Sequence, residues 1–444
     1  MFEVRATRSR SAVVVGILLM AAAAAAQPPT DPISPPVQEP AVQEPAVQEP
    51  PVHDHSQMMH MNQTFMQDWL AVAMFNHQGG LRGSDEGRVP NWWMGMWRPL
   101  ASQPSFMITT MLSLDRVTVG RTGYAELFQA GETLDGEPIV DRQHPHDFFM
   151  QLAASWRVPI GQSLGFIVSG GPAAEPAIGP IAFMHRASSD GNPIAPLGHH
   201  TLDSTHISYG VVTAALESSR WTIEGSLFNG REPDENRWDF DFGPLDSVAG
   251  RIWFRPTTGW DIQVSAANLH EPEPLHPGDV VRATGSVSWT RLSDLGQLAL
   301  TAGTGTNFEH SEAQTNIFGE GSWSRGRNTL YGRFEIHDAD TDTLLGGGTS
   351  ALRAAAAAPE DDTSHDESGS PFSTVLALTL GGVRRVFTAK GIDIGVGGDL
   401  TVYGVPAALE SSYGSPVSAH VFLRIRPLQG RMVNMRLGQQ HSEH

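Results

Sequence analysis

Apolar and polar residues alternate with a period of two through most of the chain from about residue 104. This period places successive side chains on opposite faces of a β-strand, unlike the period of 3.6 residues of an amphipathic helix. In one such segment Trp221, Ile223 and Leu227 alternate with polar residues. We expect strands wherever the alternation recurs, at 147–158, 202–216, 221–227, 248–254, 260–268, 281–289, 298–304, 328–337, 392–403 and 417–425.

The connections between these segments alternate in length. Short turns are expected near residues 115–119, 159–161, 218–220, 257–258, 292–295, 325–326 and 388–391. Long connections are expected at 131–146, 171–201, 230–245, 270–279, 307–312, 338–371 and 404–415. Short periplasmic turns and long outer loops are typical of an outer-membrane barrel, whereas a soluble sandwich does not require them. The predicted fold is therefore all-β: an antiparallel transmembrane β-barrel of about 16 strands, within a range of about 14–18.

The number of strands stays open by one. Seventeen strands result if 67–75 and 431–437 both form strands, and an even barrel requires one to be removed. Residues 66–76 could instead form a short helix or an inserted plug.

The alternation also divides the barrel wall into a lipid face and a lumen face. A three-residue turn at 218–220 predicts that Tyr209 and Val211 share the lipid face with Ile223. The polar positions would line the lumen and include Asp147, Gln151, Arg157, His206, Glu224, Arg251, Arg255, Glu335, His337, Asp393, Asp399 and Arg424. Mixed acids and bases are expected in any porin lumen, so these residues indicate no particular solute.

The N-terminal part of the chain differs from the rest. Arginines precede an apolar run and six alanines, which predicts a secretory signal peptide at 1–26. Residues 27–52 are rich in proline and repeat Gln-Glu-Pro, so we expect a disordered, extended spacer. A Met/His-rich segment follows at 53–66. The barrel is predicted to occupy 67–444, with a disordered acidic loop around 346–371.

The charge balance and the absence of cysteine exclude several functions. The chain carries 48 acidic and 29 basic side chains, a net charge of −19, so no basic surface is available for nucleic acid. Without cysteine, disulfides, iron–sulfur clusters and thiolate catalysis are excluded. The acidic balance favours cations over anions near a pore.

Thioether and imidazole side chains are concentrated directly after the proline-rich spacer. Several of them close together could hold Cu(I), for which thioether is a preferred ligand. No hydrophobic core exists there for methionine to fill. The predicted ligands of this leader are His53, His55, Met58, Met59, His60 and Met61.

A second group of histidines lies in two predicted long loops and at the strand ends beside them. Because these segments share the outer side of the barrel, their side chains could converge over the pore mouth. Imidazole with carboxylate suits Zn(II) or Cu(II); the competing interpretation is a constriction loop whose histidines only form hydrogen bonds. The predicted ligands of the mouth are His144, His146, Asp147, His185, His199, His200 and His206.

Four methionines of the predicted wall are a separate signal. Met107 and Met111 share a face with Thr109, and Met94 and Met96 lie two residues apart between tryptophans. Thioethers on a polar face are candidates for binding a soft metal ion. The alternative is that these flexible side chains fill gaps.

Five short motifs resemble an uncharacterised family of predicted bacterial outer-membrane proteins. They are DRQHPHD at 141–147, FMHR at 183–186, HHTLDSTH at 199–206, FNGREPDE at 228–235 and PLDS at 244–247. This resemblance covers roughly residues 85–290 and implies a barrel without implying a mechanism. The tract HDHSQMMHM separately resembles the Met/His leader of the outer-membrane copper resistance protein B family, which implies copper handling.

Together these features predict a channel in the bacterial outer membrane that binds or passes transition-metal ions, with copper as the first candidate. The alternative is a general diffusion porin or small-solute channel whose histidines and methionines are incidental. A third, weaker alternative is an outer-membrane hydrolase using His146 with Asp147. We expect no enzymatic activity and no required cofactor, although a copper ion could be bound. The expected partners are outer-membrane lipid and metal ions or small solutes; a homo-oligomer and a periplasmic efflux or metal-binding partner stay open.

Overall fold

The protein is a closed antiparallel β-barrel with two segments folded into its lumen. A computed structural model describes residues 65–100, 104–202, 208–273, 278–309, 312–346 and 372–428. Seventeen strands form one sheet, and sixteen of them make up the barrel wall. These sixteen are β1 (Phe65–His77), β3 (Asn91–Leu100), β4 (Ser105–Leu112), β7 (Phe149–Ile160), β8 (Leu164–Ala174), β9 (Ser208–Glu217), β10 (Trp221–Phe228), β11 (Ser247–Phe254), β12 (Trp260–Leu269), β13 (Val280–Ser293), β14 (Gly296–Glu309), β15 (Glu312–Arg325), β16 (Asn328–Asp340), β17 (Phe372–Ala389), β18 (Ile392–Gly404) and β19 (Val417–Pro427).

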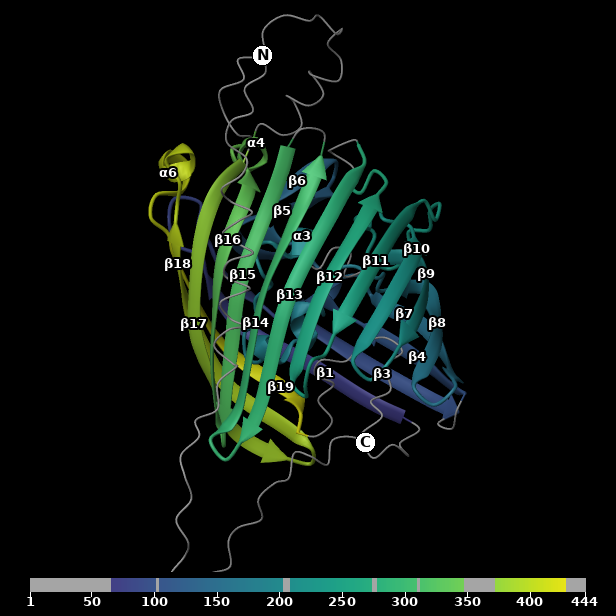
Figure 1. The fold of residues 1–444 in the computed structure, drawn as a ribbon. Coiled ribbons are helices and arrows are strands. Elements are labelled where there is room, and N and C mark those ends of the chain that lie inside the picture. Colours follow the sequence, from purple (N-terminus) through teal and green to yellow (C-terminus); the bar gives the residue numbers. More distant parts are fainter. Residues whose placement is uncertain are drawn as a thin grey trace, which may run out of the picture. The chain divides into compact units, whose positions relative to one another are not determined.

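The barrel closes because its first and last strands pair with each other. Ala71 lies opposite Ile425, and His77 lies opposite Ala419, in an antiparallel ladder. On its other side β1 pairs with β3 and then with the short strand β2 (Asp85–Arg88). The predicted count of about 16 strands is confirmed, and residues 67–75 belong to a wall strand rather than to a helix or plug (Figure 1). The predicted signal peptide, spacer, Met/His leader, acidic loop and strand at 431–437 lie outside the described residues.

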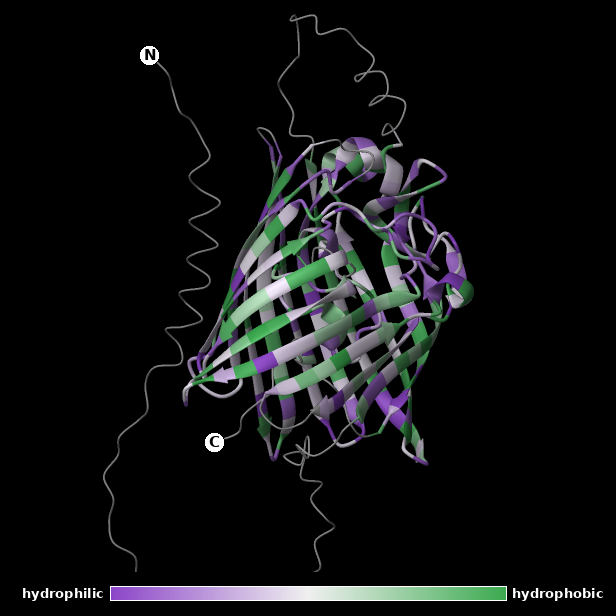
Figure 2. Ribbon diagram, turned by 90° about the vertical axis from the view of Figure 1, so that its right-hand side faces the viewer, coloured by the Kyte–Doolittle hydropathy of each residue, from purple (hydrophilic) through white to green (hydrophobic). Residues whose placement is uncertain are grey.

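Apolar side chains point outward from the wall and polar ones point inward. Leu380 and Leu400 lie opposite each other on β17 and β18 and are 61% and 58% exposed. The adjacent pair, Thr379 and Thr401, is buried inside, with the two hydroxyl oxygens 2.8 Å apart. Figure 2 shows this alternation of hydropathy along the strands. An exterior of this kind suits a hydrocarbon surround, and a closed wall has no unpaired edge.

One predicted face is wrong. The β9–β10 hairpin pairs Glu217 with Thr222, one residue away from the pairing that a three-residue turn would give. Because side chains alternate with a period of two, this shift exchanges the faces. Tyr209 and Val211 are therefore buried inside the barrel, whereas Ile223 is exposed outside, as predicted.

The connections follow the predicted asymmetry, with two corrections. Residues 115–119 do not form a short turn, because the helix α2 (Asp115–Thr118) begins a long connection from β4 to β7. Residues 307–312 do not form a long loop, because β14 and β15 stay paired up to Glu309 and Glu312. The other helices are short: α3 (His199–Leu202), α4 (Thr341–Leu344), α6 (Ala407–Tyr413), and the 3-10 turns η2 (Phe183–His185) and η3 (Ala187–Ser189). In the part of the chain that the structure describes, no helix is long and apolar enough to cross a membrane.

The connection from β4 to β7 carries a hairpin that is not part of the wall. Strands β5 (Tyr124–Leu134) and β6 (Glu137–Gln143) pair only with each other, and we call them the inner hairpin. Tyr124 belongs to the same buried cluster as Phe422 of the wall, and Asn76 Nδ2 donates to the carbonyl of Ala125 at 2.7 Å. The hairpin therefore occupies the lumen.

The connection from β8 to β9 also folds inward, and we call residues 175–202 the inner loop. It carries η2, η3 and α3. Its hydrogen bonds follow the inner wall from β10 to β19: Ala177 with Ser226, Arg186 with Glu320, Leu197 with Glu335, and Asp190 with Arg424 and Arg426. The inner loop thus crosses the lumen and is held on both sides.

Candidate functional site

Three histidines meet where the inner hairpin and the inner loop touch. His144 directly follows β6, and His199 and His200 begin α3. One ring nitrogen from each residue lies within 4.8 Å of the others. The ring centroids are 4.1 Å apart for His199 and His200, 5.3 Å for His144 and His200, and 5.7 Å for His144 and His199. We call these residues the trihistidine cluster.

Each ring of the trihistidine cluster has an oxygen next to its Nδ1 atom. His144 Nδ1 lies 3.1 Å from Glu132 Oε1, and His200 Nδ1 lies 3.0 Å from Glu232 Oε1. His199 Nδ1 lies 3.0 Å from the carbonyl oxygen of Pro196, which precedes the helix, and 3.0 Å from the Gln129 amide nitrogen, which can only donate. In His144 and His200, a proton donated from Nδ1 to the carboxylate fixes the ring and makes Nε2 the metal-binding nitrogen, the usual arrangement of metal-ligating histidines.

Three imidazoles form a suitable ligand set for Zn(II) or Cu(II), with a fourth position left for water or solute. A bound ion would hold nitrogens at about 2.0–2.1 Å, so the rings would move slightly closer together on binding. The Gln143 amide nitrogen lies 3.4 Å from His199 Nε2, at the edge of the cluster.

A glycine makes room for one of the rings. Gly131 of β5 has a φ of +147°, and a Cβ at this position would lie 2.7 Å from His200 Nε2. No real Cβ comes so close to another atom, so any side chain here would displace the His200 ring. The inner hairpin therefore contributes to the cluster in two ways: Gly131 leaves room for the His200 ring, and the end of β6 positions His144.

A buried ionic network supports the cluster from behind. Arg237 bridges Glu132 and Asp147, with Asp147 Oδ2 3.1 Å from Nη1, and all three side chains are buried. Burial raises the pKa of Glu132 and Asp147, to about 6 for Asp147, and the guanidinium opposes this rise. Burial disfavours the charged form of His200, but Glu232 and Glu132 raise its pKa above the usual value. Burial opposes the charged form of Glu232, but His200 lowers the pKa of this carboxyl below its usual value, so Glu232 keeps a negative charge beside the cluster that would offset the charge of a bound cation.

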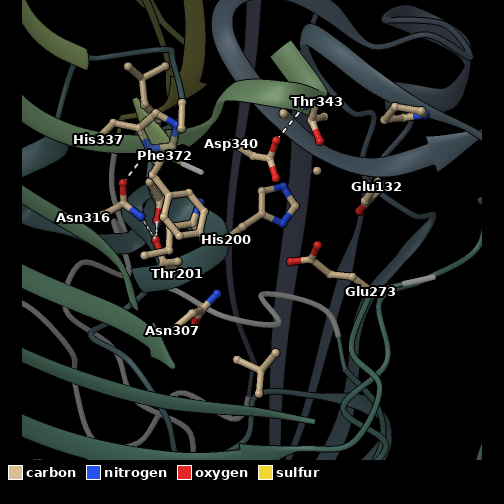
Figure 3. A pocket seen from close by; sticks show the side chains of 18 of the residues that line it. Glu132, His200, Thr201, Glu273, Asn307, Asn316, His337, Asp340, Thr343 and Phe372 are labelled. Atoms are coloured by element: carbon tan, nitrogen blue, oxygen red, sulfur yellow. Dashed lines mark hydrogen bonds between the residues drawn. The ribbon is translucent and has the colours of Figure 1, made fainter. Parts of the chain in front are cut away.

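An acidic cavity of about 140 Å³ adjoins the cluster and reaches His200. We call it the acidic vestibule. Figure 3 shows the His200 ring between the carboxylates of Asp340, Glu273 and Glu132. The carboxylates that line it come from Glu132, Glu232, Glu273, Glu309, Glu312 and Asp340. Such a concentration of one sign of charge raises the local concentration of cations.

The other predicted ligands of the mouth are not members of this cluster. The His146 ring lies edge-on to His144, with the centroids 6.2 Å apart, but its Nδ1 lies 2.7 Å from Asp115 Oδ2, and Asp147 accepts from Arg237. His185 packs edge-on against Trp92, with the ring centroids 5.2 Å apart. Burial lowers the pKa of His185 to about 4, so its ring is neutral at neutral pH. His206 and the leader ligands at 53–61 lie outside the described residues.

Two residues of the site were not predicted from the sequence. Glu132 and Glu232 orient rings of the cluster, yet they lie 12 and 32 residues from the histidines that they contact. No metal-ligand spacing reveals such partners. The one available signal is that Glu232 falls within the motif FNGREPDE.

No family model and no curated protein matches the chain. Several solved structures show a distant likeness. OprB of Pseudomonas putida matches with a TM-score of 0.49 and 8% identity, covering 82% of this chain and 93% of that one. A loop-deletion mutant of OmpT, an outer membrane protein of Vibrio cholerae, matches with 0.46 and 8%, covering 82% and 100%. OmpF of Salmonella typhi in complex with daunomycin matches with 0.46 and 9%, covering 81% and 97%. Similarity this low supports no conclusion about function.

Proposed function

We propose that this protein is an outer-membrane channel for transition-metal ions and that the trihistidine cluster is a binding site on their path. Cu(II) is the first candidate and Zn(II) is the alternative for the same ligands. The observation that carries the proposal is the convergence of His144, His199 and His200, with each Nδ1 beside an oxygen.

The location in the outer membrane is supported by the surface of the wall. Outward residues such as Leu330, Leu380 and Val421 are more than half exposed, which is unfavourable in water over a whole barrel and favourable in lipid. Every wall strand pairs on both sides, so the backbone needs no water for its hydrogen bonds.

The preference for cations is supported by the acidic vestibule, through which an ion would reach His200. The ion is cargo in this proposal, so no resident cofactor is required. A site that passes an ion on must bind it strongly enough to select it and weakly enough to release it. Three neutral ligands with one open position satisfy this requirement better than a closed four-ligand site.

The inner loop argues against the alternative of a general diffusion porin. Arg186 forms an ion pair with Glu320 at 2.7 Å, and both side chains are nearly fully buried. Glu320 also pairs with Arg333 at 3.0 Å. A loop held across the lumen by such pairs restricts passage, whereas a general porin needs an open lumen.

The experiment is a metal-binding measurement on the full chain. All proteins carry a leader-silent background, in which His53, His55 and His60 are replaced by Ala and Met58, Met59 and Met61 by Leu. After dialysis against Cu(II), we expect about one bound ion per chain. Replacing the trihistidine cluster by alanine should abolish this binding while heat-modifiable migration shows a folded barrel.

The matched control is the double variant His77→Ala and His270→Ala. These histidines are half-exposed and also pair with carboxylates, Asp85 and Asp279. The control should keep the bound ion. Equal Cu(II) and Zn(II) content in the background and the cluster variant would refute the proposal.

A further inference from the structure

Methionines gather at one sector of the inner wall. Met94 and Met96 of β3, Met107 and Met111 of β4, and Met150 of β7 are all at most 7% exposed and pack together. We call these five residues the methionine wall. Met66 of β1 and Met184 of the inner loop pack against it. Seven of the fifteen methionines of the chain therefore lie in one place.

The strand register brings the thioethers together. Met94 lies opposite Met111, and Met66 lies opposite Met96, on neighbouring antiparallel strands. Directly paired residues have Cβ atoms about 4.5–5.5 Å apart, which is within reach for long side chains. The alternate residue Trp97 is exposed on the outside, so the methionines of this sector face inward.

Gap filling does not explain this composition. The other three buried clusters are built largely from valine, leucine, isoleucine, alanine and aromatic residues, and only Met74 is a methionine among their buried members. Among the described residues, the cluster around the methionine wall contains no leucine, isoleucine or valine. A barrel lumen normally presents polar side chains, and a structural core would use branched aliphatic ones. Thioethers are distinguished from both by their affinity for soft metal ions.

The inner loop covers the methionine wall and adds a nitrogen ligand. Met184 packs against the wall, and the next residue, His185, contacts Trp92 at the edge of the same cluster. Both residues line a second cavity of about 80 Å³. Asp68, which is buried and lies opposite Met94, lines this cavity as well and provides a negative charge. Through this cavity an ion meets the thioether of Met184, the imidazole of His185 and the carboxylate of Asp68, and Met184 in turn packs against the methionine wall.

We propose that the methionine wall, with Met184 and His185, is a binding site for a soft monovalent metal ion, Cu(I) or its analogue Ag(I). It shares no residue with the trihistidine cluster and differs from it in chemistry. Imidazole with carboxylate suits Cu(II) or Zn(II), whereas thioether selects Cu(I) and is a poor ligand for Zn(II). The barrel would therefore hold two sites for two kinds of ion. Each of the two proposals can be refuted without refuting the other.

The test uses full-length, folded protein in the leader-silent background, so that the leader contributes no thioether. Cu(I) is titrated in competition with a chromogenic Cu(I) chelator, and Ag(I) serves as a probe that is stable in air. The wall variant replaces Met94, Met107, Met111 and Met150 by leucine, which keeps the volume and the apolar character of the sector. Two control variants are Met74→Leu, a buried inward methionine of another cluster, and the trihistidine-to-alanine variant.

We expect the background and both controls to bind Cu(I) and Ag(I), and the wall variant to lose this binding. Equal Cu(I) binding by the wall variant, or none by the background, would overturn the proposal. X-ray absorption at the copper edge of the Cu(I)-loaded background protein gives a second measurement that needs no wall variant. Sulfur scatterers are expected there, and a shell of nitrogen and oxygen alone would also overturn the proposal. Cu(II) binding to the trihistidine cluster is measured separately and does not decide this result.

Discussion

Arg237 and Glu132 form a buried ion pair that joins the β10–β11 connection to the inner hairpin. The other carboxylate oxygen of Glu132 contacts His144 Nδ1. The position of the His144 ring therefore depends on Arg237, which lies 93 residues further along the chain. Arg237 also holds Asp147, two residues before the start of β7. Through this guanidinium, three separate segments fix one side of the trihistidine cluster.

The first prediction tests this support. Glu132→Gln keeps the size of the side chain but weakens the hydrogen bond that orients His144, and Arg237 retains Asp147 as a partner. We expect Cu(II) affinity to fall by about 10–100-fold, the usual effect of losing an orienting partner. Isothermal titration of the folded barrel measures it. The control Glu137→Gln changes an exposed carboxylate of the same hairpin and should leave the affinity unchanged. Unchanged affinity in Glu132→Gln would show that Glu132 does not orient a metal ligand.

The second prediction concerns the space beside His200. In Gly131→Ala the new Cβ would lie 2.7 Å from His200 Nε2, so the ring must move. We expect Cu(II) affinity to fall by about tenfold or more, as for other losses of ligand orientation. Gly136→Ala is a matched control, because Gly136 also has a positive φ in the same hairpin, but a Cβ there would meet no atom within 4 Å. If both variants bind Cu(II) equally, the position of the His200 ring is irrelevant to binding.

The third prediction concerns the inner loop. Arg186→Met combined with Asp190→Asn removes the ion pairs of the loop with Glu320 on β15 and with Arg424 and Arg426 on β19. Removing one partner of a buried pair destabilises its surroundings by about 3–5 kcal/mol, so we expect the loop to detach while the paired wall stays closed. Single-channel conductance in a planar bilayer should rise.

The control for the inner loop breaks a pair that does not cross the lumen. Arg231 and Asp246 form an ion pair at 2.9 Å, with both side chains about 30% exposed. Arg231→Met with Asp246→Asn should leave conductance at the parent level. If the conductance of the loop variant is no higher than that of this control, the inner loop does not restrict passage through the lumen.

The fourth prediction concerns orientation in the membrane. The chain has no cysteine, so single cysteines report without background. Ser219 lies in the tight β9–β10 turn, and Ser411 lies in the exposed helix α6 among the long connections. Ser411→Cys should react with an impermeant maleimide on intact cells, and Ser219→Cys should react only after the outer membrane is opened. Labelling of both positions on intact cells would contradict the proposed orientation.

Much of the barrel could be predicted because its physics is local. The alternation around Ile223 and Leu227 reflects the two faces of each strand directly. The face of Tyr209 and Val211 was predicted wrongly, since one additional residue in the turn after Glu217 shifts the whole strand by one position. The sequence pattern could not distinguish the inner hairpin from a wall strand. Apolar residues of the hairpin such as Phe128, which stacks on Tyr413, are buried inside the barrel, and their sequence does not show what they pack against.

The candidate site was predicted only in part for a related reason. His144, His199 and His200 stand out in the sequence, but their meeting depends on two connections that both fold into the lumen. Glu132 and Glu232 act through contacts between distant segments, which no local spacing encodes. His146 and His185, which look equivalent in the sequence, lie against Asp115 and Trp92 instead.

The most direct test of the trihistidine site is a crystal structure of the leader-silent protein soaked with Cu(II), with diffraction recorded on both sides of the copper absorption edge. We expect one anomalous peak between His144, His199 and His200, with nitrogen ligands at about 2.0–2.1 Å. A fully occupied copper peak elsewhere, with none between these three rings, would contradict a metal site at the cluster.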